Sequence, residues 1–288
     1  MVQLHRVRCG LAYRTLSSSA VATRVRDTRR YVYKEDDMIP RLLAALRYLR
    51  GSDKPWRWRI HAGRCPACHG GYFLSFAESA FHTRCLGCAA TAVNLSMIPV
   101  ISSHLEGQFG GKRVYEMSSY GATYGYLRRH FLDAYFSEYF EGRPLGITVN
   151  DVRNEDATRL SFAADFFDIV TSNQVFEHVH DDMQAYAECY RVLKPGGGLI
   201  FTVPLYDTPK TERIARLSLA GTIEWLGEPE YHDSRLGGPQ SAPVFWRHSI
   251  NDVAMRVARA GFTSVEVVPV SVLKNDNFAQ PVVYAIKR

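Results

Sequence analysis

Four cysteines lie in two pairs with the spacing of a metal-binding unit. Each pair has the form C-x2-C, and 16 residues separate the two pairs, which comprise Cys65, Cys68, Cys85 and Cys88. Zinc takes four ligands in a tetrahedron, and a gap of two residues lets one tight turn present both sulfurs to the same ion. Four thiolates leave no position open for water. The spacing therefore predicts a structural zinc site and not a catalytic one.

The cysteine-rich unit, which we place at residues 61–102, is too short to be stabilised by apolar burial alone. Bound zinc would therefore supply much of its stability. His69 or His82 could replace one thiolate, although four sulfurs complete the site without either. Disulfides are the other alternative. They are disfavoured because no secretory signal segment is recognisable, and we expect a cytoplasmic protein with reduced thiols.

A strand and a tight loop are predicted next along the chain. An apolar run ends at Glu116, and the small residues Ser118 and Gly121 follow it. In a parallel α/β sheet a ligand binds at the carboxyl ends of the strands, beside the first loop and the N-terminus of the next helix. Glu138 lies near the expected end of a second strand, where a carboxylate accepts hydrogen bonds from the ribose hydroxyls of a nucleoside cofactor. Neither acidic residue alone is sufficient to indicate a cofactor site, because most acidic residues at strand ends lie on the surface and face solvent.

Four further motifs follow in order. They are Asp156-Ala-Thr-Arg-Leu-Ser-Phe162, Phe167-Asp-Ile-Val170, Glu177-His-Val179 and Arg191-Val-Leu-Lys-Pro-Gly-Gly197. With these motifs, the chain from about residue 112 to 205 resembles the class I S-adenosylmethionine-dependent methyltransferases. It is most similar to the type 11-like group, which methylates small molecules and similar acceptors. The resemblance implies a Rossmann-like fold and S-adenosylmethionine as the cofactor.

The resemblance also implies roles for individual residues. Glu138 would bind the ribose hydroxyls, Asp156 would accept a hydrogen bond from the adenine amino group, and the loop after Glu116 would wrap the methionine part. The cofactor-binding residues that it implies are Glu116, Met117, Ser118, Gly121, Glu138, Asp156, Asn173 and Gln174.

The loop after Glu116 departs from the family pattern. Members usually carry glycine at the positions of Ser118 and Tyr120, because a Cβ atom there crowds the cofactor. Ser118 is small enough to keep the approach open and could donate a hydrogen bond, whereas Tyr120 must point away or stack. Two interpretations stay open: a subgroup with its own loop, or weakened cofactor binding.

Methyl transfer from a sulfonium depends mainly on positioning. The reaction is an in-line displacement with a good leaving group, so holding the acceptor near the methyl group supplies most of the rate. A general base is needed only where the acceptor must lose a proton. His178 is the candidate base, and the alternative is that it caps or packs within the Glu-His-Val motif. His232 and His248 lie in residues 205–250, which we expect to cover the acceptor with aromatic side chains.

The elements that position these residues alternate between strand and helix. Strands are predicted at 113–117, 147–152, 167–171, 198–203, 265–270 and 282–286, and helices at 124–135, 183–193, 211–226 and 249–260. This alternation is typical of a parallel sheet covered on both faces. The predicted fold class is α/β, with a Rossmann-like, seven-stranded, mostly parallel sheet and a small N-terminal zinc-ribbon-like unit.

The basic character of the chain is confined to its N-terminal part. Residues 1–60 carry fourteen Lys and Arg against five Asp and Glu, whereas the rest of the chain is net acidic. The formal net charge of the whole chain is +6. We interpret 1–60 as a basic arm with a helix at 40–50, and 103–288 as the methyltransferase domain. The first thirty residues fit either a mitochondrial transit peptide or a start codon placed too far upstream. No apolar run is long enough to predict a transmembrane helix.

The sequence thus predicts an S-adenosylmethionine-dependent methyltransferase for a small-molecule or glycan-type acceptor. One alternative is RNA methylation, with the zinc unit and the basic arm docking RNA through phosphate contacts. The net acidic catalytic domain and the lack of a stripe of Arg and Lys disfavour it. A non-catalytic module, whose altered loop no longer holds cofactor, is the second alternative. The sequence specifies neither the methyl acceptor nor the oligomeric state.

Overall fold

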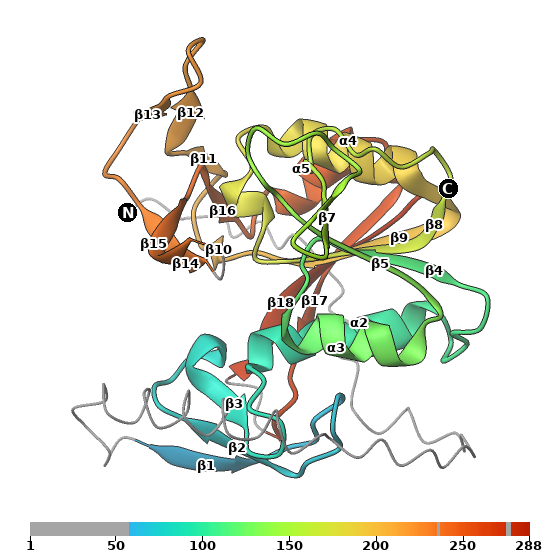
Figure 1. Ribbon diagram of the computed structural model, residues 1–288. Coiled ribbons are helices and arrows are strands. Elements are labelled where there is room, and N and C mark those ends of the chain that lie inside the picture. The colour runs from blue at the N-terminus through green and yellow to red at the C-terminus, as the bar shows by residue number, and fades with distance from the viewer. Residues whose placement is uncertain (1–57, 235–236, 275–277) are drawn as a thin grey trace, which may run out of the picture.

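An eight-stranded sheet forms the centre of the computed structural model, which describes residues 58–234, 237–274 and 278–288 (Figure 1). The predicted helix at 40–50 and nearly all of the basic arm lie outside this range. The sheet has the strand order β17-β18-β9-β8-β4-β5-β7-β6. Its strands are β4 (Arg113–Glu116), β5 (Asp133–Glu138), β6 (Thr148–Val149), β7 (Val152–Asn154), β8 (Phe167–Asn173), β9 (Leu193–Thr202), β17 (Ser264–Val270) and β18 (Gln280–Ile286).

The strand order reverses beside β4. From β4 the chain passes to β5 and β7 on one side, and then to β8 and β9 on the other. These five strands are parallel, whereas β18 runs antiparallel between β9 and β17. Ligands of open α/β sheets bind beyond the carboxyl ends of the strands at such a switch point. The predicted α/β fold is confirmed, with seven strands in this arrangement and β6 as an added two-residue edge.

Helices cover both faces of the sheet, as Figure 1 shows. One face carries α4 (Asp182–Val192) and α5 (Val253–Arg259), and the other carries α2 (Ala92–His104) and α3 (Gly121–His130). The Asp181 carboxylate accepts a hydrogen bond from a backbone N–H in the first turn of α4 at 3.1 Å, and thereby caps a helix end that would otherwise leave its donors unpaired. No helix among the described residues is long and apolar enough to cross a membrane.

Helix α2 joins the cysteine-rich unit to the sheet. The unit consists of the short antiparallel strands β1 (Arg59–Ala62), β2 (Tyr72–Ser75) and β3 (Thr83–Cys85) and the 3-10 turn η4 (Ala80–His82). Most residues of α2 are buried, because it packs on the unit on one side and on the sheet on the other. Phe73 of the unit, Ile98 of α2 and Val282 of the sheet belong to one apolar core. A helix that is apolar around its whole circumference has this kind of buried position.

The predicted helix at 211–226 is wrong. The segment instead forms short strands, with β12 (Ala215–Leu217) paired antiparallel to β13 (Ile223–Trp225). Gly221, at φ +77°, makes the turn between them. Leu217 and Leu219 are exposed, so the apolar residues that suggested a helical stripe have no core to cover.

Two further boundaries differ from the prediction. The helix predicted at 124–135 ends at His130, and β5 takes over at Asp133, because the apolar side chains of that stretch pair within the sheet. The strand predicted at 147–152 is divided between β6 and β7. Asn150 and Asp151 have φ values of +50° and +63°, which is the geometry of a type I′ hairpin turn.

Residues 205–250 form a layer of short strands that covers one end of the sheet. The strands are β10 (Leu205–Tyr206), β11 (Glu212–Arg213), β12, β13, β14 (Tyr231–Ser234), β15 (Gly238–Pro243) and β16 (Trp246–Ser249). The backbone N–H of Phe245 donates to the carbonyl of Glu177 at 2.8 Å, and the indole N–H of Trp246 donates to the carbonyl of Val179 at 2.9 Å. These bonds hold the layer against the turn that follows β8.

Candidate active site and metal centre

The four cysteines meet in the cysteine-rich unit with the geometry of a metal site. All four Sγ atoms lie within 4.8 Å of one another. Cys65 and Cys88 are 3.7 Å apart, and Cys68 and Cys85 are 3.5 Å apart. A tetrahedral zinc ion with Zn–S bonds of about 2.3 Å requires sulfur separations of roughly 3.8 Å. The structure thus brings together the four predicted ligands, and neither His69 nor His82 belongs to the cluster.

Two matching turns present the four sulfurs. In each turn a backbone N–H donates to the carbonyl of the first cysteine of the pair, from His69 to Cys65 at 2.9 Å and from Ala89 to Cys85 at 2.8 Å. His69 and Ala89 both adopt positive φ. The backbone N–H of Gly87 also points at the Cys85 sulfur, 3.3 Å away. N–H groups aimed at sulfur stabilise a thiolate, as a metal ligand requires.

The second candidate site is a cavity of about 680 Å³ at the carboxyl ends of β4 and β8. Its volume is in the range of small-molecule sites. The strand ends contribute four residues, the layer of 205–250 and Pro204 contribute six, and the cysteine-rich unit and its neighbouring helices contribute most of the rest. The lining residues are Phe81, His82, Asn94, Glu116, Ser118, Tyr120, Thr123, Asn173, Gln174, His178, Pro204, Tyr206, Tyr231, His232, Asp233 and Gln240.

Glu116 closes β4 at the floor of this cavity. Its carboxyl group is almost wholly buried and accepts a hydrogen bond from the Thr171 hydroxyl. Burial raises the pKa of Glu116 to about 8, and the charge of Glu138 adds to the rise while the Thr171 bond opposes it. Glu116 is therefore mostly protonated at neutral pH, and a cationic ligand beside it would favour the ionised form.

The unusual loop after Glu116 is tied to the second strand. The backbone N–H and the hydroxyl of Ser119 both donate to Glu138 Oε1 at 2.8 Å. Gly121 opens α3 at φ +91°, a conformation that favours glycine. Tyr120 is 42% exposed and lines the rim of the cavity, and Ser118 lines its wall. Glu138 thus anchors the loop through one carboxylate oxygen, and Oε2 accepts no hydrogen bond within the described residues.

Two side-chain amides at the carboxyl end of β8, those of Asn173 and the following Gln174, have no partners for their N–H groups. Asn173 accepts a hydrogen bond from the Thr202 hydroxyl at 3.1 Å, but its Nδ2 is buried and unbonded, as is Nε2 of Gln174. Gln174 adopts φ +56°, and its backbone N–H donates to the carbonyl of Thr202 at 2.9 Å. Buried donors without acceptors are costly and rare. Both residues line the cavity, so a ligand with acceptor atoms would satisfy them.

Not every predicted cofactor residue reaches this cavity. Met117 is buried in an apolar core cluster and does not line the cavity. Asp156 caps its own turn, because Oδ1 accepts hydrogen bonds from the backbone N–H and the hydroxyl of Thr158 at 2.8 and 2.7 Å. Gly121, Glu138 and Asp156 are absent from the lining. Four of the eight predicted residues, Glu116, Ser118, Asn173 and Gln174, share one wall.

His178 faces the cavity from the turn η5 (Phe176–His178). Its Nδ1–H donates to the carbonyl of Pro243 at 2.8 Å, so the lone pair belongs to Nε2. Burial lowers the pKa of His178 to about 4, with the bond to Pro243 opposing the shift and His232 adding to it. The imidazole is therefore neutral at physiological pH. His178 Nε2 lies 3.2 Å from His232 Nδ1. This contact was not predicted from the sequence.

His248 does not share this position. It is fully buried, its ring nitrogens have no hydrogen-bond partners within the described residues, and Nδ1 is 3.9 Å from the Asp182 carboxylate. It does not line the cavity. Of the two histidines that the sequence placed in residues 205–250, only His232 reaches the candidate site.

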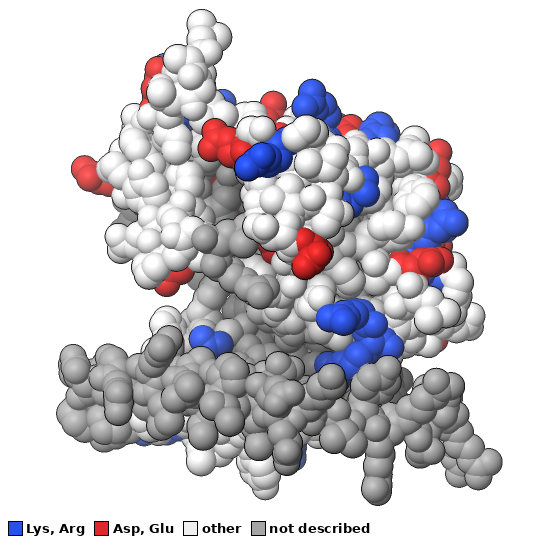
Figure 2. Space-filling view, in the orientation of Figure 1, with Lys and Arg blue, Asp and Glu red and all other residues white. Residues whose placement is uncertain are grey.

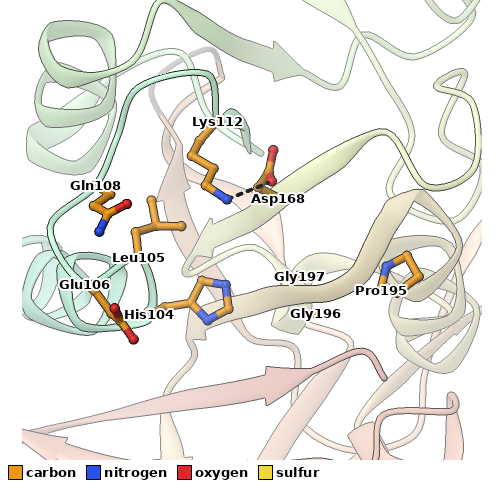
Figure 3. A pocket seen from close by; sticks show the side chains of 9 residues that line it. All are labelled: His104, Leu105, Glu106, Gln108, Lys112, Asp168, Pro195, Gly196 and Gly197. Atoms are coloured by element: carbon orange, nitrogen blue, oxygen red, sulfur yellow. Dashed lines mark ion pairs between the residues drawn. The ribbon is translucent and has the colours of Figure 1, made fainter.

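A second cavity, of about 360 Å³, lies at the opposite end of the sheet (Figure 3). It is lined by His104, by Lys112 and Asp168 at the amino ends of β4 and β8, and by the glycine turn at the start of β9. Asp168 accepts hydrogen bonds from the Arg113 backbone N–H at 2.9 Å and the Lys194 ammonium at 2.7 Å. Ligands of such sheets bind at the carboxyl ends of the strands, so this cavity is not the cofactor site.

Asp168→Asn is expected to lower the melting temperature by roughly 2–4 °C, because it removes about 1 kcal/mol of ion pairing. Burial alone would raise the pKa of Asp168, but Arg113 and Lys194 hold it below its usual value. The carboxylate therefore stabilises the fold above the unfolded pKa of about 3.9, and the effect is lost as the pH falls through the lower folded pKa. Thermal unfolding of both proteins at neutral and acidic pH checks this. A gap that persists in acid would contradict it.

Comparison with known proteins supports the fold of the central segment. Residues 128–201 match the family described as a methyltransferase domain. The ubiquinone biosynthesis O-methyltransferase of Cereibacter sphaeroides is 36% identical over 81 residues, which are 28% of this chain and 32% of the relative. That of Parvibaculum lavamentivorans is 29% identical over 123 residues, or 42% and 43% of the two chains. The chain spans less than half the length of these relatives.

One solved structure illustrates the level of structural similarity. The S-adenosylmethionine-dependent methyltransferase from Mesorhizobium loti is 18% identical, with a TM-score of 0.44, and the match covers 67% of this chain and 98% of that one. The family match includes β8 and α4, with Asn173, Gln174 and His178, and leaves out the loop after Glu116, the cysteine-rich unit and residues 205–250. The evidence for the role of the Glu116 loop, the cysteine-rich unit and residues 205–250 therefore comes from the structure of this chain alone.

Proposed function

We propose that the protein is an S-adenosylmethionine-dependent methyltransferase for a small-molecule acceptor, with a glycan-type or hydroxylated aromatic compound as the substrate class. The observation that carries the proposal is the pair of unbonded amides, Asn173 and Gln174, at the carboxyl end of β8. They lie beside the switch point of a methyltransferase-like sheet, where a ligand with acceptor atoms is expected. The relatives named ubiquinone biosynthesis O-methyltransferases support an oxygen acceptor.

The cofactor would lie across the ends of β8, β4 and β5, with the unbonded Asn173 Nδ2 donating a hydrogen bond to it. In this arrangement Glu138 Oε2 accepts hydrogen bonds from the ribose, Asp156 lies on the adenine side, and Ser118 faces the methionine part. The backbone near Met117 and Gly121 shapes the loop. The methyl group would then point into the cavity beneath His178 and Tyr206, whose side chains line it. Positioning the acceptor there supplies most of the rate, and His178 Nε2 is the neutral base available to an acceptor hydroxyl.

The four cysteines would hold a structural zinc ion. The sulfur separations support this assignment, and four thiolates leave no open coordination position. The unit also contributes Phe81 and His82 to the cavity wall. Zinc would therefore stabilise one side of the acceptor site without entering the chemistry.

The charge of the described residues on the face shown in Figure 2 favours a small acceptor over RNA at that face. On the face shown in Figure 2, Lys and Arg are interspersed with Asp and Glu, apart from a small basic group that lies over α3. The last turn of α3 carries Arg128 and Arg129. Recognition of nucleic acid requires an extended basic surface, and its affinity falls steeply with salt.

Asn173→Ala is expected to weaken S-adenosylmethionine binding roughly tenfold, because one hydrogen bond to the ligand is worth about 1.4 kcal/mol. Gln184→Ala, which removes an exposed amide on α4, is the matched control. Release of S-adenosylhomocysteine is then measured with catechols, sugars and an RNA oligonucleotide. Turnover with a catechol or a sugar, reduced in Asn173→Ala, supports the proposal. Turnover with RNA alone, weakening steeply with salt, would contradict the small-molecule assignment.

A further inference from the structure

Three side chains with metal-binding atoms converge beside the acceptor cavity. Glu177 and His178 come from the turn after β8, and His232 comes from β14. Their ligand atoms all lie within 4.8 Å of one another, with His178 Nε2 3.2 Å from His232 Nδ1 and 3.8 Å from Glu177 Oε1. Both histidines line the cavity. Residues 54 positions apart thus form one cluster at the place where an acceptor would bind.

The outer partner of one of the two imidazoles, His178, matches that of a metal ligand. A histidine that binds a metal through one nitrogen usually donates its other N–H to a carbonyl or a carboxylate. His178 does so through Nδ1–H, which donates to the carbonyl of Pro243 at 2.8 Å and leaves Nε2 facing the cluster. His232 Nε2 lies 3.6 Å from Glu230 Oε1, which is a nearby carboxylate and not a hydrogen-bonded partner, and His232 Nδ1 faces the cluster.

The buried carboxyl group of Glu177 is a second feature that indicates a bound cation, independent of the two imidazoles. The Glu177 side chain is 1% exposed, and neither carboxyl oxygen has a hydrogen-bond partner within the described residues. A buried carboxyl group without a partner is costly, and a cation next to it removes that cost. The turn holds it in place, because the Glu177 carbonyl accepts the Phe245 N–H at 2.8 Å.

We propose that Glu177, His178 and His232 form a site for a divalent first-row transition-metal ion, with its remaining coordination positions open to the cavity. The inference deepens the proposed function, on which it rests for the identity of the cavity. Two imidazoles and one carboxylate suit Mn²⁺, Fe²⁺ or Zn²⁺ and leave positions for exogenous ligands. An acceptor oxygen, from a hydroxyl or a carboxylate, would bind the open positions. In the metal-bound protein His178 is a ligand and not the base; the ion would lower the pKa of a bound acceptor hydroxyl, whose proton would pass to water.

The two metal sites of this chain differ in chemistry and can be filled separately. Four thiolates are soft ligands that select zinc, whereas carboxylate and imidazole accept manganese. Mn²⁺ is therefore a probe for the Glu-His-His cluster that does not displace zinc from the cysteines. It is also paramagnetic, so binding is read directly from the loss of its free-ion resonance.

The test is a titration of the zinc-loaded full-length protein with Mn²⁺, followed by electron paramagnetic resonance. The expected result is one bound Mn²⁺ per chain, with affinity reduced at least tenfold in His232→Ala and in Glu177→Gln. His180→Ala removes an imidazole outside the cluster and is expected to bind as the wild type does. Glu177→Gln preserves the shape of a buried side chain, and thermal unfolding verifies that each variant is folded.

Equal Mn²⁺ binding by the wild type and by both folded cluster variants would overturn the proposal, as would the absence of any binding by the wild type at millimolar Mn²⁺. Failure of the proposed function looks different. If the protein bound Mn²⁺ through these residues but no S-adenosylmethionine, the metal site would stand and the methyltransferase assignment would fall.

Discussion

Cys85→Ser is expected to release zinc and to lower the melting temperature of the chain by roughly 10 °C. A structural zinc site contributes on the order of 10 kcal/mol of binding free energy. Losing about a third of that, at roughly 2–4 °C per kcal/mol for a domain of this size, gives the expected shift. The effect extends beyond the cysteine-rich unit, because Phe73 shares one apolar core with α2 and the sheet.

Backbone hydrogen bonds are a second reason why loss of zinc is expected to destabilise the rest of the chain as well as the cysteine-rich unit. The Arg64 N–H donates to the carbonyl of Val272 at 2.9 Å, and the Lys274 N–H donates to the carbonyl of Ala62 at 3.0 Å. The unit is thus bonded to the segment after β17 as well as packed on α2. Loss of zinc is therefore expected to disturb the cavity wall at Phe81 and His82 and to reduce acceptor turnover.

Metal analysis and thermal unfolding check this expectation. Cys189→Ala is the matched control, because Cys189 is a fully buried cysteine remote from the four-sulfur cluster. The control is expected to keep one equivalent of zinc, whereas Cys85→Ser loses it. If Cys85→Ser melted within a degree or two of the wild type and kept its zinc, the structural role of the metal would be wrong.

Glu138→Ala is expected to weaken S-adenosylmethionine binding by about 100-fold, or roughly 2.7 kcal/mol. Two losses combine in this variant: the hydrogen bonds that hold the Ser119 loop and the carboxylate oxygen that the ribose would use. Glu138→Gln keeps an oxygen acceptor but removes the charge, so it is expected to lie between Glu138→Ala and the wild type.

The control for Glu138 is its neighbour Glu141. Its side chain is exposed beyond the end of β5, so Glu141→Ala preserves the change in net charge without touching the loop. Isothermal titration calorimetry of the three variants measures the effect. Equal losses in Glu138→Ala and Glu141→Ala would show that overall charge, and not the anchored loop, determines the affinity.

The parts that local pattern determines could be predicted from the sequence. Two C-x2-C turns fix the sulfurs within a few residues, so their spacing was sufficient to predict the cluster. The strand end at Glu116 was predicted because its apolar run stops where the chain leaves the core, whereas the start of β5, which ends at Glu138, falls in the helix predicted at 124–135. The order of motifs then gave the fold class.

Contacts made by the fold over long distances were not predictable. The meeting of His178 and His232 depends on the register of the β14–β15 hairpin and on the Phe245 bond to Glu177. Short strands such as β11 and β12 have too few residues to show a period of two, which is why the sequence pattern of 211–226 predicts a helix instead. The isolation of the Glu177 carboxyl group is likewise a property of the packed structure alone.

The departure at Ser118 and Tyr120 has a physical resolution in the structure. Ser119 replaces the flexibility of a glycine-rich loop with two hydrogen bonds to Glu138, and Tyr120 is placed at the rim of the cavity. A loop fixed in this way needs no further ordering when a ligand binds. These contacts favour the interpretation of a subgroup with its own loop over that of weakened binding.

Calorimetric titration of the folded, zinc-loaded protein with S-adenosylmethionine tests the central claim most directly. The account predicts saturable heat for one site per chain, with Kd on the order of 1–100 µM. S-adenosylhomocysteine is expected to compete for the same site. No heat at millimolar S-adenosylmethionine, with the protein shown to be folded and to hold zinc, would contradict the account.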